Sequence, residues 1–192
     1  MTRIFPTLAS LSLMLFVGAV VMGLSIGDLY DSPTEATLAW RGRHMLLGTA
    51  AALAVVFVEC VVVTYFIGTS RWCKEVTEAY RLDAKHVVAS NRLKRSAFPC
   101  CVTGMLAVVG IGALGAASDP GTDLPHTEAT ATYHLAAALG GACLIGWTYY
   151  RSWLSIVGNQ EVIQRIVAEV RRIRRQRGLD TDEAEASSFA SG

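Results

Sequence analysis

Two histidines, His44 and His134, have the residue type and the placement that most directly suggest chemistry. Each stands at the start of an apolar run long enough to cross a membrane. The distribution of cations described below puts both starts near the same membrane face. Two imidazoles that approach one iron from opposite sides can serve as its axial ligands. The pair therefore predicts one bis-histidine b-type haem near the outer face, used for electron transfer.

Small residues follow each histidine on the same helical face, because positions about one and two turns apart lie on one side of an α-helix. These predicted slot residues are Gly48 and Ala51 after His44, and Ala138 and Gly141 after His134. They would leave room for a flat macrocycle. The same residues would equally let helices approach closely without a ligand, and an interfacial histidine also serves as a polar anchor. A haem-free packing role therefore stays open.

A divalent metal is the alternative use of the two histidines, with His126 in the second outer loop as a third ligand. Imidazole nitrogens suit zinc and copper. His126 nevertheless lies more than two helical turns before His134, and the sequence has no His-x-x-x-His spacing. His126 is therefore a weak outer-face candidate for a metal ligand.

Two charged residues, Glu59 and Arg151, interrupt the apolar runs. The helical rise of about 1.5 Å per residue places Glu59 ~22 Å inward of His44, and Arg151 ~25 Å inward of His134. A charge at that depth is costly and is usually paired or functional. We predict an ion pair between the two side chains. The alternative is a protonatable Glu59 in a proton or cation path.

Four apolar runs must position these residues, at 8–27, 44–67, 98–117 and 133–157. The chain of 192 residues is 52% hydrophobic and 17% charged, whereas a soluble domain carries about 25% charged residues. Crossing a bilayer takes about 20 helical residues, and a segment in lipid must satisfy its own backbone hydrogen bonds. The sequence predicts an all-α polytopic membrane protein, built as a four-helix transmembrane bundle.

The cations indicate the orientation of the chain. Seven lie between the second and third runs, and six lie in the tail after the fourth. Short loops rich in lysine and arginine stay in the cytoplasm. Both termini are therefore predicted to be cytoplasmic, in a cell's inner membrane. The net charge of only +1 gives no reason to expect a nucleic-acid partner.

The residues after the fourth run form two further predicted regions beyond the membrane domain, which spans 1–160. Residues 161–177 place valines and isoleucines at helical spacing with arginines opposite, which predicts a basic amphipathic cytoplasmic helix. It would lie on an anionic leaflet or pack on a partner helix. A solvated extension of the fourth helix is the alternative. Residues 178–192 are rich in acidic residues, alanine and serine, and predict a disordered tail.

Short repeated segments suggest that the chain contains two related helical hairpins. Residues 34–37 and 127–130 both read Thr-Glu-Ala-Thr, and residues 19–21 and 107–109 both read Ala-Val-Val. A parallel repeat of this kind is related by an axis along the membrane normal. It would place the second and fourth helices diagonally opposite.

The function predicted from these features is non-catalytic, because the sequence has no nucleophile elbow, phosphate loop or zinc-protease motif. We predict a subunit or accessory protein of a membrane complex that carries the haem. Its partners would be the lipid bilayer and a membrane protein or a second copy of the chain. The alternatives are a small proton or cation transporter that uses Glu59, and a haem-free membrane scaffold.

Overall fold

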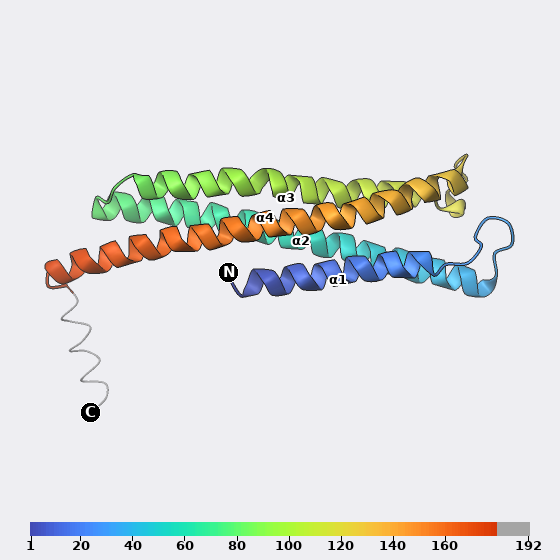
Figure 1. Ribbon diagram of the computed structural model, residues 1–192, viewed down its shortest axis with the longest axis horizontal. Helices are drawn as coiled ribbons and strands as arrows, with labels where there is room; N and C mark the ends of the chain where they lie inside the picture. The colour runs from blue at the N-terminus through green and yellow to red at the C-terminus, as the bar shows by residue number, and fades with distance from the viewer. Residues whose placement is uncertain (180–192) are drawn as a thin grey trace, which may run out of the picture.

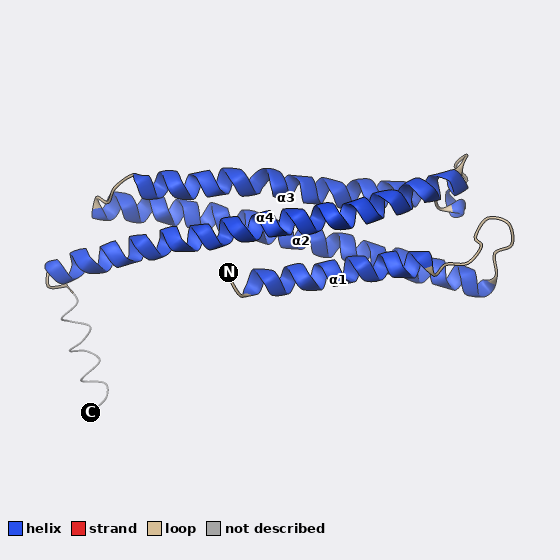
Figure 2. Ribbon diagram, viewed as in Figure 1, coloured by secondary structure: helices blue, strands red, loops and turns tan. Residues whose placement is uncertain are grey.

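The computed structural model describes residues 1–179, and their regular structure is entirely helical (Figure 2). The predicted all-α class is therefore confirmed. The predicted disordered tail lies, from residue 180 onward, outside the described residues. The elements in chain order are α1 (Ile4–Leu24), α2 (Glu35–Tyr80), α3 (Lys85–Ala117), the 3-10 helix η1 (Pro120–Thr122) and α4 (Thr127–Gln176).

The four α-helices pack as an antiparallel bundle (Figure 1). The α1–α2 connection and η1 lie at one end, which we call the loop end. The short α2–α3 connection lies at the other, which we call the turn end. Helices α2 and α4 each pack against both α1 and α3, and they also touch one another across the centre. The two histidine-bearing helices are therefore diagonally opposite, as the repeat predicts.

All four α-helices are long and apolar enough to cross a membrane. The four predicted runs fall on four separate helices, and α2, α3 and α4 extend well beyond them. Large apolar side chains also cover the outside of the bundle: Met14, Leu46 and Leu106 are 71%, 76% and 66% exposed. Such a surface would be unfavourable in water and is consistent with an integral membrane protein.

Local side-chain bonds start the helices outside the apolar runs. Thr34 caps α2, since its Oγ1 accepts the Thr37 N–H at 3.2 Å. At the turn end, Asp83 Oδ1 accepts the Lys85 N–H at 2.9 Å. That backbone bond favours the ionised carboxylate, and the pKa of Asp83 is accordingly lowered. The Thr34 cap fixes where α2 begins, and the Asp83 bond holds the α2–α3 connection against the first residue of α3.

Helices α2, α3 and α4 continue toward the turn end beyond the start of α1 (Figure 1). This three-helix part, residues 69–80, 85–95 and 159–176, is called the extension. The prediction of a separate amphipathic helix at 161–177 was wrong, because α4 is unbroken from Thr127 to Gln176. The helix continues through Gly158 without a break. The apolar face does not lie on a leaflet either, since Val162 and Ile166 are buried against Cys73 of α2 and Leu93 of α3.

Candidate functional site

His44 of α2 and His134 of α4 face each other inside the bundle near the loop end. Their ring centroids are 6.1 Å apart, and the ring planes cross at 74°. Both residues are half-buried. The structure thus brings together the two histidines that the sequence places at equal depth on different helices.

A hydrogen bond to a backbone carbonyl of a neighbouring helix holds each imidazole. His44 Nδ1 lies 3.0 Å from the Ala19 oxygen of α1, and His134 Nδ1 lies 3.1 Å from the Ile111 oxygen of α3. A carbonyl can only accept, so each Nδ1 carries a proton and the neutral ring keeps its lone pair on Nε2. Within residues 1–179 no hydrogen bond engages either Nε2. Metal-ligating histidines are oriented in this way.

Two glycines allow the imidazoles to reach these carbonyls. Gly23 follows Ala19 by one turn, and Gly115 follows Ile111 by one turn. Because Cα–Cβ bonds tilt toward the N-terminus of a helix, a side chain at either glycine would stand over the carbonyl of the preceding turn. A Cβ on Gly23 would lie 2.9 Å from His44 Cε1, and one on Gly115 would lie 3.0 Å from His134 Cε1. Any other residue at either position would therefore push the ring away.

The site consists of two equivalent halves, each with one histidine, one carbonyl and one glycine. The equivalence continues along the buried faces, where the structurally matched pairs include Phe16 with Val108, Ala51 with Gly141, Val55 with Ile145, Glu59 with Tyr149, and Ser12 with Gly104. The short sequence repeats have other offsets in both helices of each hairpin: Thr-Glu-Ala-Thr recurs after 93 residues and Ala-Val-Val after 88, whereas His44 and His134 are 90 apart and Ala19 and Ile111 are 92 apart. Ala19 matches Ile111, which lies one turn beyond Ala107.

Three of the four residues predicted to form a haem slot line the interior of the bundle. Ala51, Ala138 and Gly141 are buried in the interior. Gly48 is half-buried, and a Cβ there would meet nothing within 4 Å, so it does not line the same space. The space beside Gly141 is filled by the side chains of Ile111 and Phe16. The expectation of an open slot was therefore wrong, because the opposite helices supply bulky side chains that a single-helix pattern does not reveal.

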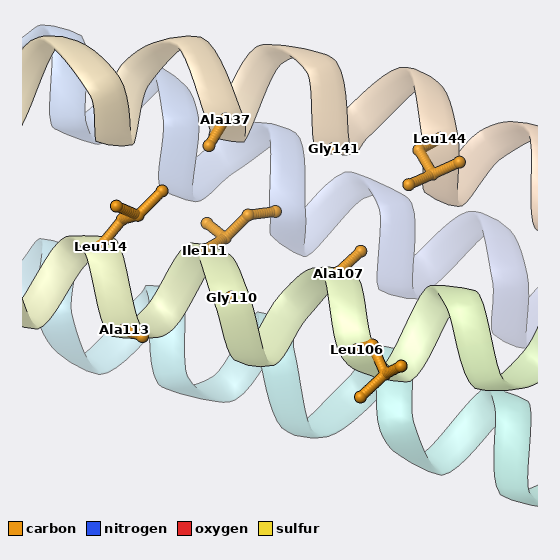
Figure 3. Close-up of a pocket in the computed structure, with 9 residues that line it drawn as sticks. All are labelled: Leu106, Ala107, Gly110, Ile111, Ala113, Leu114, Ala137, Gly141 and Leu144. Carbon is orange, nitrogen blue, oxygen red and sulfur yellow. The ribbon is translucent and has the colours of Figure 1, made fainter.

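A groove on the outer surface of α3 and α4 reaches this part of the bundle (Figure 3). Its volume is about 620 Å³. Ile111 lies between the two helices and fills the space beside Gly141, a predicted slot residue that also lines the groove. Rotation of the Ile111 side chain into the groove would open space near His134. The lining residues are Leu106, Ala107, Gly110, Ile111, Ala113, Leu114, Ala137, Gly141 and Leu144.

The structure does not bring together the three histidines of the alternative metal site. In the part of the chain that the structure describes, no group of three or more His, Cys, Asp or Glu side chains could hold a metal ion. His126 precedes α4 with a left-handed backbone, at φ 63°, and its ring does not join His44 and His134. Its weak candidacy rested on its place in the second outer loop, and the described residues assemble no three-ligand group there.

Glu59 and Arg151 do not form the predicted ion pair. Glu59 is fully buried, and its Oε1 accepts a hydrogen bond from Thr148 Oγ1 at 3.1 Å. Arg151 is exposed on α4. Among residues 1–179 no ion pair joins the two side chains. The prediction failed because equal depth does not imply equal orientation, and Arg151 is on the outward face of its helix.

Arg41 is a further charged residue near the histidine pair. It lies one turn before His44 on α2, and its Nη2 is 3.5 Å from Asp119 Oδ1. The contact joins α2 to the connection between α3 and α4. It places a cation at the loop end of the site.

The chain was also compared with known proteins. No family model, curated protein or solved structure in these comparisons matches it.

Proposed function

We propose that the protein is an integral membrane electron carrier that binds one b-type haem between His44 and His134. The observation that carries the proposal is the histidine pair, with centroids 6.1 Å apart and each Nδ1 held by a carbonyl. That arrangement supports metal ligation through the two Nε2 atoms. The porphyrin supplies the other iron ligands, so two protein side chains are sufficient.

The spacing of the rings supports an axial ligand pair. Imidazole nitrogens bind transition metals at about 2.0 Å, so two axial rings have centroids about 6 Å apart once the ring radii are added. Closely packed rings without a metal between them can also meet at such a distance. They do not, however, account for two carbonyl bonds and two glycines arranged in the same way. The matched carbonyl bonds and the matched glycines are what favour the haem.

The residues around the histidine pair would hold a haem once two side chains have moved. Ala51, Ala138 and Gly141 offer small surfaces, while Phe16 and Ile111 must turn aside to admit the macrocycle. Arg41 carries the charge that would neutralise haem carboxylates at the loop end. The haem would supply a one-electron ferric–ferrous couple. The protein's own residues would hold the iron and shield it from water.

The orientation belongs to the same proposal. The cation-rich segments flank the α2–α3 turn and the end of α4, so we place the turn end and both termini in the cytoplasm of a cell with an inner membrane. The loop end and the haem then lie near the outer face. One haem near one face cannot carry electrons across the bilayer alone. The protein is therefore proposed to be an accessory subunit that passes electrons to a membrane partner.

A visible spectrum of the detergent-purified protein, made with ample haem, tests the proposal. We expect a Soret band that His44→Ala and His134→Ala each abolish. The matched controls are His126→Ala and His86→Ala, which remove histidines outside the pair and should keep the band. A colourless wild-type protein that is folded, as judged by its helical circular dichroism, would contradict the haem and favour a haem-free scaffold.

The alternative of a transporter that uses Glu59 receives less support. Between Glu59 and the histidine pair the buried side chains are apolar, and they include Val55, Val108 and Ile145. A continuous ion path across the bundle would need polar groups there. We therefore do not propose transmembrane transport.

A further inference from the structure

Most of the fully buried polar side chains lie in one half of the bundle, while the half-buried histidine pair lies in the other. Among the described residues, every buried polar side chain except Thr37 lies at the depth of Glu59 or nearer to the turn end. The buried residues between Glu59 and the histidine pair are apolar. The polar set consists of Ser12, Glu59, Ser70, Thr77, His86, Ser90, Thr148, Ser152, Ser155 and Asn159. Serine and threonine also serve close helix packing in membranes, whereas a buried carboxyl such as Glu59 is costly and is usually paired or functional.

Glu59 ends this set and lacks a counter-ion. Its Oε2 is buried with no hydrogen-bond partner, and only Thr148 Oγ1 donates to Oε1. Gly104 of α3 makes the space, because a Cβ there would lie 2.6 Å from Glu59 Oε1. The other titratable groups that face the carboxyl are Cys101 of α3 and Tyr149 of α4. A carboxylate buried without a cation is strongly unfavourable, whereas the neutral acid is tolerated.

Polar side chains lead from Glu59 along one face of α4. Thr148, Ser152, Ser155 and Asn159 are spaced by four, three and four residues, which places them on one helical face. The Cys101 thiol of α3 lies close to both Glu59 and Ser152. Ser152 Oγ has no partner of its own among the described residues. Such unpartnered buried oxygens are usual sites for ordered water.

Asn159 is the node at which α2, α3 and α4 meet. Its side chain accepts from Ser90 Oγ at 2.9 Å and donates to Tyr65 Oη at 3.2 Å and Thr69 Oγ1 at 3.0 Å. All three helices of the extension therefore contribute to one hydrogen-bonded group. It lies on the turn-end side of Ser152.

Polar groups recur toward the turn end, beside the buried apolar cluster of Cys73, Val162 and Ile166. Ser70 and Thr77 of α2 are among these groups, each with a buried hydroxyl oxygen that lacks a partner. His86 of α3 then meets Glu169 of α4, with 3.0 Å between Nε2 and Oε2. The Glu169 side chain is 29% exposed. We call the whole series, from Glu59 to Glu169, the polar column.

We propose that Glu59 is a proton-binding site that is filled from the turn end through the polar column. A hydronium ion at the mouth gives up a proton, water and side-chain hydroxyls relay it, and the Glu59 carboxylate becomes a carboxylic acid. No other bond is made or broken. The apolar residues beyond Glu59 close the path, so the column is an inlet and does not conduct protons across the membrane. This proposal does not depend on the haem.

Infrared spectroscopy of the full chain in lipid nanodiscs tests the site. We expect a protonated carboxylic-acid C=O band that Glu59→Gln removes and that shifts when H₂O is replaced by D₂O. Exchange should be about tenfold slower or more in Asn159→Leu, the factor given by an added opening barrier of about 1.4 kcal/mol. Ser152→Ala should slow it less. Thr49→Ala is the control, because it removes an exposed α2 hydroxyl on the loop-end side of Glu59, outside the column.

Two results would overturn the proposal. One is a wild-type protein without a Glu59-dependent acid band at any pH at which it stays folded. The other is a band whose exchange is unchanged in Asn159→Leu. Should Asn159→Leu fail to fold, as judged by circular dichroism, the comparison is made on Ser90→Ala, which removes one donor to the node. Neither result depends on haem, so the spectrum of the histidine variants remains an independent test.

Discussion

At the scale of single residues, the site depends on positions that carry no functional group. Gly23 and Gly115 each let an imidazole lie against the carbonyl one turn earlier in the neighbouring helix. The carbonyl then fixes the tautomer and the direction of the ring. The chemistry of His44 and His134 is therefore set by the backbone of α1 and α3.

Gly115→Ala should displace His134, because the new Cβ would lie 3.0 Å from Cε1. Overpacking of this kind costs about 1–3 kcal/mol. We expect a lower thermal midpoint of unfolding and weakened haem binding, measured by haem titration. Gly112→Ala is the matched control on the same helix, since its Cβ would meet nothing within 4 Å. Equal haem affinity in the two variants would contradict the role given to Gly115.

The sequence predicted the histidine pair but not the residues that hold it. The pair was predictable because both histidines begin apolar runs with the same direction. Gly23 and Gly115 were not, because their role depends on the rotation and register of two other helices. The failed Glu59–Arg151 pair has the same cause. The depth of a residue follows from its position along the helix. The direction in which its side chain points depends on how that helix is rotated against its neighbours.

At the scale of elements, the length of α4 joins the two halves of the molecule. One helix carries His134, the α4 part of the polar column and the apolar face of the extension. The sequence analysis divided it near residue 160, where the composition changes from apolar to basic. Composition marks where a helix leaves the membrane, but only a break in hydrogen bonding ends it, and no proline follows Gly158 within α4.

Ile166→Ala tests whether the end of α4 packs on its own chain. Ile166 is fully buried against α2 and α3, and truncation of a buried isoleucine costs about 2–5 kcal/mol. Amide hydrogen exchange in residues 159–176 should become faster, with the membrane-embedded part of α4 unaffected. The exposed Gln164→Ala is the control and should leave exchange unchanged. Protection that persists in Ile166→Ala would mean that another surface covers this face.

At the scale of the whole molecule, the two buried sites lie at different depths with an apolar barrier between them. The helical rise separates His44 from Glu59 by ~22 Å. An electron near the loop end and a proton in the inner half would still interact. At an effective dielectric constant of about 20, two unit charges at this separation interact by about 0.8 kcal/mol. The fold thus permits weak coupling of a redox step to protonation.

Glu59→Gln measures that coupling if the haem is present. A neutral Glu59 favours the reduced haem, so the midpoint potential should fall by about 35 mV as rising pH ionises the group, by the scale of 59 mV per tenfold for one electron. The variant should show a flat potential at the higher value. Glu161→Gln, an exposed carboxyl on the same chain, should keep the wild-type slope. Parallel curves for wild type and Glu59→Gln would exclude the coupling.

The division of the histidine pair between two hairpins has a consequence for biosynthesis. The first hairpin supplies one ligand and its carbonyl support, and it cannot hold the iron from both sides. The second ligand arrives only with α4, which is made after α1, α2 and α3. Capture of the cofactor would therefore occur only after every span is inserted in the correct direction. The colour of bound haem would therefore indicate that all four spans are in place. A truncated or inverted chain would remain colourless.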